Sequence, residues 1–315
     1  MKDIDIDISR WYNAHLFFEG EIMKVFSKNM QGIFYVGLCI FLWSMIPMFA
    51  KLSQSRLDHH QYLFYSSIVS FVSLLFISIL NHKTHELFKY SGKVYLFLFL
   101  LGFLDFFYYL LLYFGYQKSN GLEVLVIQYT WPIFIVLLSL WILKEKLTFN
   151  KMISLILGFM GVSLIITKGD FTKVDFGNMD VILMVLLGAV SFALFSVLSK
   201  KVAINLTNAV TIYFFTAIIY AFISMQTFSF FIFPTAKEWL FILINGIFLN
   251  GVSYLFWIKA LQNADASFVA PFIFITPILS AGFLITFFDE PIVPVYFIGL
   301  VLIILSGLAN SLKKR

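Results

Sequence analysis

The sequence predicts an all-α membrane protein with ten transmembrane helices, arranged as two inverted five-helix repeats. Of its 315 residues, 61% are hydrophobic and only 12% are charged, and the mean hydropathy is +0.92. Soluble domains have about 45–50% apolar and about 25% charged residues, so this chain has too few charges to cover a water-exposed surface. The composition therefore excludes an ordinary soluble enzyme, and it is far too apolar for a disordered chain.

Apolar runs of helix length recur along the chain between short polar breaks. A hydrocarbon core about 30 Å thick takes about 20 helical residues, and the runs are continuous rather than alternating, which favours helices over barrel strands. The short connections leave no room for a soluble catalytic domain, and residues 1–30 are expected to form a polar cytosolic leader. The predicted spans are 32–50, 62–80, 94–116, 122–143, 151–167, 180–199, 209–228, 238–260, 266–288 and 293–311.

The basic residues predict the orientation of the chain. They are scattered between apolar runs, so we attribute the net charge of +5 to membrane orientation rather than to nucleic-acid binding. If the N-terminus is cytoplasmic, most lysines and arginines fall in cytoplasmic segments. We therefore expect both termini in the cytoplasm and a multi-pass protein in the inner or plasma membrane of a bacterium. The single cysteine, Cys39, excludes an intramolecular disulfide.

An internal repeat is the most informative pattern in the sequence. Pro132 and Pro277 lie 145 residues apart, and the same offset aligns further pairs of residues. Because each copy holds five spans, the second copy must cross the membrane in the opposite sense, as in inverted-repeat transporters with a midplane site between their halves. The repeat therefore favours a transporter, with a receptor or scaffold as the alternative. The aligned pairs include Phe103 with Phe248, Asp105 with Asn250, Tyr109 with Tyr254, Gln117 with Gln262, and Glu145 with Glu290.

Several short motifs resemble the drug/metabolite transporter superfamily, EamA type, over residues 31–312. They are Leu42-Trp43-Ser44 with Pro47, Pro132 followed by Glu145, and Pro277 followed by Glu290. A further set resembles the aromatic amino acid exporter subgroup, namely Gly115-Tyr116, Glu123-Val124, Tyr129, Trp131-Pro132, and Tyr254 with Trp257. The resemblance implies a ten-helix exporter of small metabolites with a central cavity and EamA-type repeats at 31–168 and 180–312. The polar leader and Asp105 depart from the family pattern.

The candidate substrate-binding residues are polar or aromatic side chains inside the predicted spans. Asp105 lies near the middle of the third span, where a charged carboxylate costs roughly 2.5–3.5 kcal/mol on insertion scales, so a role with a substrate amino group or a proton is expected. A buried structural carboxylate is the alternative. The aromatic residues could stack a flat substrate or simply face lipid. The full set is Asp105, Trp43, Tyr109, Gln128, Tyr129, Trp131, Asn250, Tyr254 and Trp257.

Further residues are predicted to gate the site or to serve structure. Pro132 and Pro277 remove helical hydrogen bonds inside their spans, so they are candidate gating bends or simple packing kinks. Glu123 is a candidate entrance residue, or an acid that complements the helix dipole. Glu145 and Glu290 end their spans and are expected to neutralise nearby loop groups.

The sequence shows no catalytic motif, and we expect no enzymatic activity, no metal and no cofactor. The expected function is alternating-access export of small metabolites, namely amino acids and within them the aromatic ones. The alternative cargo is a cationic or nucleoside-like metabolite or a drug, which Asp105 and Glu123 would attract. The expected partners are a small-molecule substrate and the lipid bilayer, not nucleic acid, and the oligomeric state stays open, with a monomer as one option.

Overall fold

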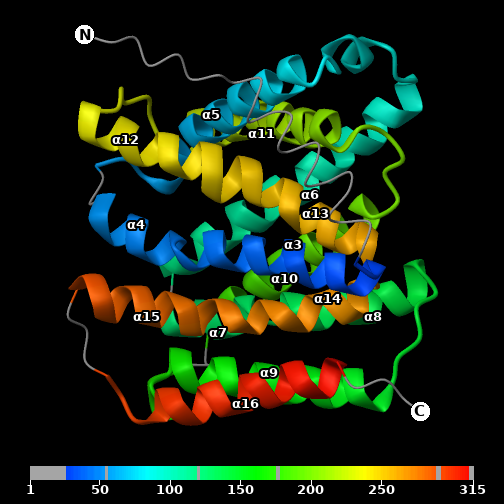
Figure 1. Ribbon diagram of the computed structural model, residues 1–315. Coiled ribbons are helices and arrows are strands. Elements are labelled where there is room, and N and C mark those ends of the chain that lie inside the picture. The colour runs from blue at the N-terminus through cyan, green and yellow to red at the C-terminus, as the bar shows by residue number, and fades with distance from the viewer. Residues whose placement is uncertain (1–25, 54–55, 119–120, 175–177, 289–291, 312–315) are drawn as a thin grey trace, which may run out of the picture.

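The computed structural model describes residues 26–53, 56–118, 121–174, 178–288 and 292–311 (Figure 1). The predicted leader, except for its last five residues, lies outside these ranges. Every regular element in the described residues is helical. The predicted fold class is therefore confirmed at the level of an all-helical protein.

Nine helices in the described residues are long and apolar enough to cross a membrane. Their ends fall close to the predicted ones, because polar caps and loops bound the apolar runs. A further apolar helix, Val295–Asn310, coincides with the tenth predicted span but is shorter, so the count of ten stays a prediction. The nine are Lys28–Phe49, His59–Leu80, Gly92–Lys118, Val124–Ile142, Phe149–Ile166, Met179–Ser199, Leu206–Phe228, Ala236–Asn263 and Ala266–Phe288.

Four of these spans are built from more than one helical element. The first contains α3 (Lys28–Ser44) and α4 (Ile46–Ser53), and the fourth contains α7 (Gly121–Gln128) and α8 (Trp131–Ile142). The eighth joins α12 (Ala236–Ile244), the π-helix η4 (Asn245–Val252) and α13 (Ser253–Asn263). The ninth joins α14 (Ala266–Val269), the 3₁₀ helix η5 (Ala270–Ile275) and α15 (Thr276–Phe288). The others are α5 (His59–Leu80), α6 (Gly92–Lys118), α9 (Phe149–Ile166), α10 (Met179–Ser199), α11 (Leu206–Phe228) and α16 (Val295–Ser311).

Short polar side chains begin many of the helices. A residue at the N-cap accepts a hydrogen bond from a backbone N–H that the first helical turn leaves free. The Asp58 side chain accepts a hydrogen bond from the Gln61 N–H, and the Gln61 side chain accepts one from the Asp58 N–H. Helix α5 therefore begins with a full capping box. Thr235 and Glu238 form the same arrangement at α12. Ser27, Thr148, Asn178 and Asn205 cap α3, α9, α10 and α11.

The main helix pairings join the first half of the chain to the second (Figure 1). α5 packs against α11 at one edge of the bundle, and α9 packs against α16 at the other. Between them, α6 packs against α10 and α3 against α13. If the five spans of each half are numbered in order, the second pairs with the second, the fifth with the fifth, and the first of each half with the third of the other. A two-fold axis between the halves would produce this pattern.

Glycines allow the α9–α16 pair to approach closely. A Cβ on Gly161 would lie 2.9 Å from the Gly299 carbonyl oxygen, and a Cβ on Gly299 would lie 3.0 Å from the Gly161 carbonyl oxygen. Backbone atoms limit both positions, so neither can gain a side chain unless the helices separate. Small residues at helix contacts are the usual means by which membrane helices pack.

We predict that Gly161→Ala lowers the melting temperature of the detergent-purified protein. Overpacking of a close contact costs roughly 1–3 kcal/mol, and here the added methyl group meets a backbone carbonyl. Gly37→Ala in α3 is the matched control, because a Cβ at Gly37 has nothing within 4 Å. It should leave the melting temperature unchanged or raise it. Equal melting temperatures for the two variants would contradict the proposed contact.

Candidate functional site

Asp105 lies on α6 in the interior of the bundle, and only 5% of its surface is exposed. The Tyr254 hydroxyl, from α13, donates a hydrogen bond of 2.7 Å to Asp105 Oδ1 and lies 3.3 Å from the Tyr109 hydroxyl. No hydrogen bond from another described residue engages Asp105 Oδ2. The carboxylate thus keeps one acceptor atom for a ligand.

An aromatic cluster adjoins this carboxylate and takes one side chain from each of four spans plus Tyr254. Trp43 on α3 lies 5.6 Å from Trp257 and 6.2 Å from Tyr254, measured between ring centroids. Trp131 at the start of α8 contacts Trp257 at 5.6 Å and Phe192 of α10 at 5.0 Å. Most of these contacts are edge-on or tilted, which is the favoured geometry for aromatic pairs.

Serines hold two of the indole rings in place. The Trp43 N–H donates to Ser253 Oγ at 2.9 Å, and the Trp257 N–H donates to Ser196 Oγ at 3.1 Å. Ser196 and Ser253 are fully buried. An indole N–H without an acceptor would be costly in an apolar interior, so each serine fixes the orientation of one ring.

The structure brings six of the nine predicted substrate-binding residues into one connected set. These are Asp105, Tyr109, Tyr254, Trp43, Trp131 and Trp257. The other three share no hydrogen bond or ring–ring contact with this set within the described residues. Asn250 is buried in the π-helix η4. Gln128 and Tyr129 are half-buried at the break before α8, and Gln128 Oε1 is buried without a hydrogen-bond partner.

Both predicted gating prolines follow a break in their helix. Pro132 is the second residue of α8, after the interruption at Tyr129 and Thr130. Pro277 is the second residue of α15, directly after the 3₁₀ segment η5. The two breaks occupy corresponding positions in the two halves. The bends are therefore present, and the gating role stays a prediction.

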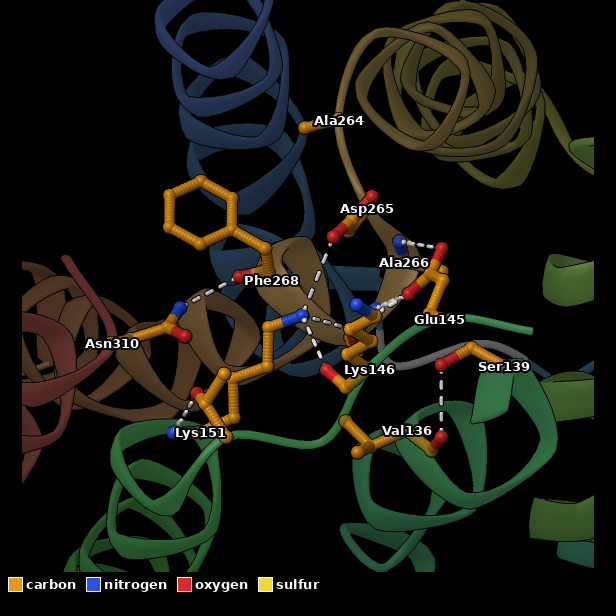
Figure 2. A network of polar contacts seen from close by, with 12 residues as sticks. Val136, Ser139, Glu145, Lys146, Lys151, Ala264, Asp265, Ala266, Phe268 and Asn310 are labelled. Carbon is orange, nitrogen blue, oxygen red and sulfur yellow. Dashed lines mark hydrogen bonds and ion pairs between the residues drawn. The ribbon is translucent and has the colours of Figure 1, made fainter. Parts of the chain in front are cut away.

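Of the three predicted glutamates, Glu145 is the one whose side chain lies in the described part of the chain. The side chain of Glu123 and all of Glu290 lie outside the described part of the chain. Glu145 is buried and bonds to the backbone N–H groups of Ala266 and Ser267, each at 2.8 Å (Figure 2). Burial raises the pKa of Glu145, but hydrogen bonds from Ser267 and Ala266 and the charge of Lys200 outweigh it and hold the pKa below its usual value. The expectation that Glu145 neutralises loop groups agrees with these contacts.

Two apolar hollows lie elsewhere in the bundle. One, of about 360 Å³, is lined by α8 and α9, and another, of about 330 Å³, lies between α7, α9 and α10. Neither includes a predicted site residue, and their walls are almost wholly hydrocarbon. They suit lipid chains better than a polar solute.

Comparison with known proteins gives the chain a family. The model of the EamA-like transporter family matches residues 30–167 and 179–312, so the family unit occurs twice. The chain belongs to the EamA-like transporter family. The proteins of this family are membrane transporters rather than enzymes.

Curated relatives and solved structures agree with this assignment. An S-adenosylmethionine uptake transporter of Rickettsia prowazekii is 28% identical over 55% of this chain and 59% of its own length. The uncharacterized transporter YetK of Bacillus subtilis is 24% identical over 65% of this chain and 64% of its own length. The match thus spans under two thirds of either relative. A solved crystal structure with 16% identity, covering 89% of this chain and 96% of its own, superposes with a TM-score of 0.81 and shares the fold.

Sequence reasoning missed Phe192, Ser196 and Ser253 as members of the site. A signal for the serines was available, because a tryptophan inside an apolar span needs a hydrogen-bond acceptor and few are at hand. No signal in the sequence indicates which serine serves which tryptophan. Phe192 is one of 40 phenylalanines, and nothing in its spacing sets it apart.

We predict that Ser196→Ala lowers the melting temperature, because it leaves the Trp257 N–H unpaired at a cost of roughly 1–3 kcal/mol. In a Trp257→Phe background the donor is already gone, so the same serine substitution should cost much less. Thermal unfolding of the two single variants and the double variant measures this coupling. An equal drop in both backgrounds would show that the bond does not stabilise the protein.

Proposed function

We propose that this protein is an alternating-access carrier of small metabolites that combine an amino group with a planar ring. Amino acids, the aromatic ones in particular, are the first class, and export is the first direction to test. The observation that carries the proposal is the buried carboxylate of Asp105, which has an unengaged oxygen and lies beside an aromatic cluster. A membrane protein seldom retains an acid at such depth without a function.

The two kinds of group in this site suit the two parts of such a solute. Asp105 Oδ2 can accept a hydrogen bond from an ammonium group, while the rings of Trp43, Trp131 and Trp257 can stack a planar group or attract a cation. Tyr254 orients the carboxylate from the second half of the chain. Substrate binding would therefore draw on both halves.

The symmetry of the chain supports the alternating-access part of the proposal. The family unit matches twice, the helix pairings are two-fold in pattern, and the helix breaks before Pro132 and Pro277 correspond. Two units of five spans related in this way would be inverted in the membrane. Each half could then adopt the conformation of the other, which would expose the site to one side at a time.

A second cargo class is favoured by the relatives. Four of them are named S-adenosylmethionine uptake transporters. S-Adenosylmethionine joins an amino acid, a sulfonium cation and a nucleoside, so its chemistry also matches a carboxylate beside stacked aromatic rings. We therefore include cationic and nucleoside-like metabolites as the alternative, and uptake as the alternative direction.

The test is flux in proteoliposomes, measured in both directions with labelled tryptophan, phenylalanine, S-adenosylmethionine, adenosine and putrescine. We expect Asp105→Asn to reduce transport of an amino-bearing substrate about ten- to hundredfold, because a hydrogen bond to a charged group is lost. Asp180→Asn is the matched control, since Asp180 is exposed in the first turn of α10. It should transport like the wild type.

Three results would contradict the proposal. Folded protein that moves none of these solutes would reject the proposed cargo classes. Equal transport by Asp105→Asn and wild type would remove Asp105 from the site. Flux of adenosine alone, unaffected by Asp105→Asn, would favour a neutral nucleoside as cargo and reject the ammonium contact.

A further inference from the structure

A network of charged groups around the buried side chain of Glu145 joins the two halves of the chain at one end of the bundle (Figure 2). Glu145, between α8 and α9, is its centre, and its side chain is only 6% exposed. Its oxygens accept hydrogen bonds from the Ala266 N–H, from the Ser267 N–H and, at 2.6 Å, from the Ser267 hydroxyl. Lys200, at the end of α10, lies 3.2 Å from Glu145 Oε1 and donates to the Ala264 carbonyl at 2.6 Å.

A second lysine, Lys151, adds further bonds between the two halves. Lys151, in the first turns of α9, donates to the Ser267 hydroxyl at 2.6 Å and lies 3.4 Å from Asp265 Oδ2. It also donates to the Lys146 carbonyl at 3.2 Å. The network thus pairs two carboxylates with two ammonium groups, so the buried side chains of Glu145 and Lys151 each have an oppositely charged partner, while Asp265 is 59% exposed.

Every member lies at or next to a helix end, and the bonds of Glu145 and Lys151 to Asp265, Ala266 and Ser267 run between the halves. Glu145 and Lys151 belong to the first half, and they hold the corner between α13 and α14 in the second. These elements must separate if the bundle opens at this end. The contacts of Glu145 are therefore contacts between parts that alternating access would move relative to each other.

The sequence repeats only one member of this network. At the 145-residue offset Glu145 corresponds to Glu290, but Lys151 corresponds to Tyr296, Ser267 to Leu122, and Lys200 to Ser55. Asp265 corresponds to Asn120. At the opposite end the described residues join the halves by different groups, namely Arg56 and the buried Glu238, whose Nη2 and Oε2 atoms lie 3.4 Å apart.

Burial differs between residues near the two ends. Towards the network, Trp257, Ile258 and Leu261 of α13 are fully buried. Towards the other end, Tyr109 and Tyr113 of α6 are only half-buried, although Tyr109 reaches the interior Tyr254. The α13 residues next to the network are therefore sealed from solvent, whereas Tyr113 is partly accessible.

We propose that the Glu145 network is a latch, which holds the bundle closed at this end until a substrate binds. This rests on the alternating-access function proposed above. Because the network must break before this end opens, it lowers the free energy of the conformation closed at this end in the absence of substrate. Substrate binding must then supply the difference before the latched end opens.

The test measures access to each end in lipid nanodiscs with a water-soluble maleimide. Cys39, the single native cysteine, is first replaced in a Cys39→Ala background. Leu261→Cys then reports on the latched end, and Tyr113→Cys reports on the other. In the otherwise wild-type background we expect Leu261→Cys to react far more slowly than Tyr113→Cys.

Glu145→Gln should raise the labelling rate at Leu261→Cys about tenfold or more, because bonds to a charged acceptor are lost. Labelling at Tyr113→Cys should fall, since opening at one end closes the other. If Glu145→Gln does not fold, Lys151→Gln takes its place and should also raise the labelling rate at Leu261→Cys. Glu86→Gln is the matched control, because Glu86 is partly exposed and pairs with Lys83, 2.8 Å away in its own loop.

Several outcomes would overturn the latch. They are an unchanged rate at Leu261→Cys, an equal rise with Glu86→Gln, or a rise at both reporters, which indicates general loosening. Flux of a solute with unchanged labelling would reject the latch and leave the proposed function standing. The expected labelling without flux of any solute would support the latch and reject the proposed cargo.

Discussion

A hydrogen-bonding group inside the hydrocarbon of a membrane must find its partner within the protein, because no water is available there. This constraint accounts for the most informative contacts in the bundle. Tyr254 bonds to Asp105, Ser196 and Ser253 accept from the two tryptophans, and Ser70 donates to the Gly246 carbonyl in the π-helix. Each bond joins two different spans, so the same constraint that satisfies the polar groups also aligns the helices around the centre.

The scaffold and its chemistry differ in symmetry. The helix pairings, the family matches and the positions of the helix breaks repeat between the halves. The charged groups do not: at the 145-residue offset Asp105 corresponds to Asn250, and Lys151 corresponds to Tyr296. A symmetric frame supplies two related shapes, and asymmetric side chains give each shape its own free energy and affinity.

Much of the fold could be predicted from the sequence, because span positions depend on a simple physical property. The predicted segment 266–288 coincides with a span of the structure, and most other ends differ by a few residues. The π-helix at Asn245–Val252 could not be predicted, since it depends on how Gly246 packs against α5. The same holds for the connection from Glu145 to Ser267, two residues 122 positions apart whose meeting only the tertiary structure determines. Asp105, Tyr109 and Tyr254 were predictable because polar groups are rare in apolar spans, whereas Phe192 was hidden among many similar residues.

The difference between Asp105 and Asn250 has a consequence for how a solute would travel. In a fully symmetric carrier, a bound molecule could lie equally well in either of two orientations related by the two-fold axis. Here only the first half places a carboxylate, that of Asp105, at the site. An ammonium group would therefore point towards α6 whether the site were open to one side of the membrane or to the other. The solute would cross without turning over, and a single enantiomer would meet the same stereochemical environment at entry and at release.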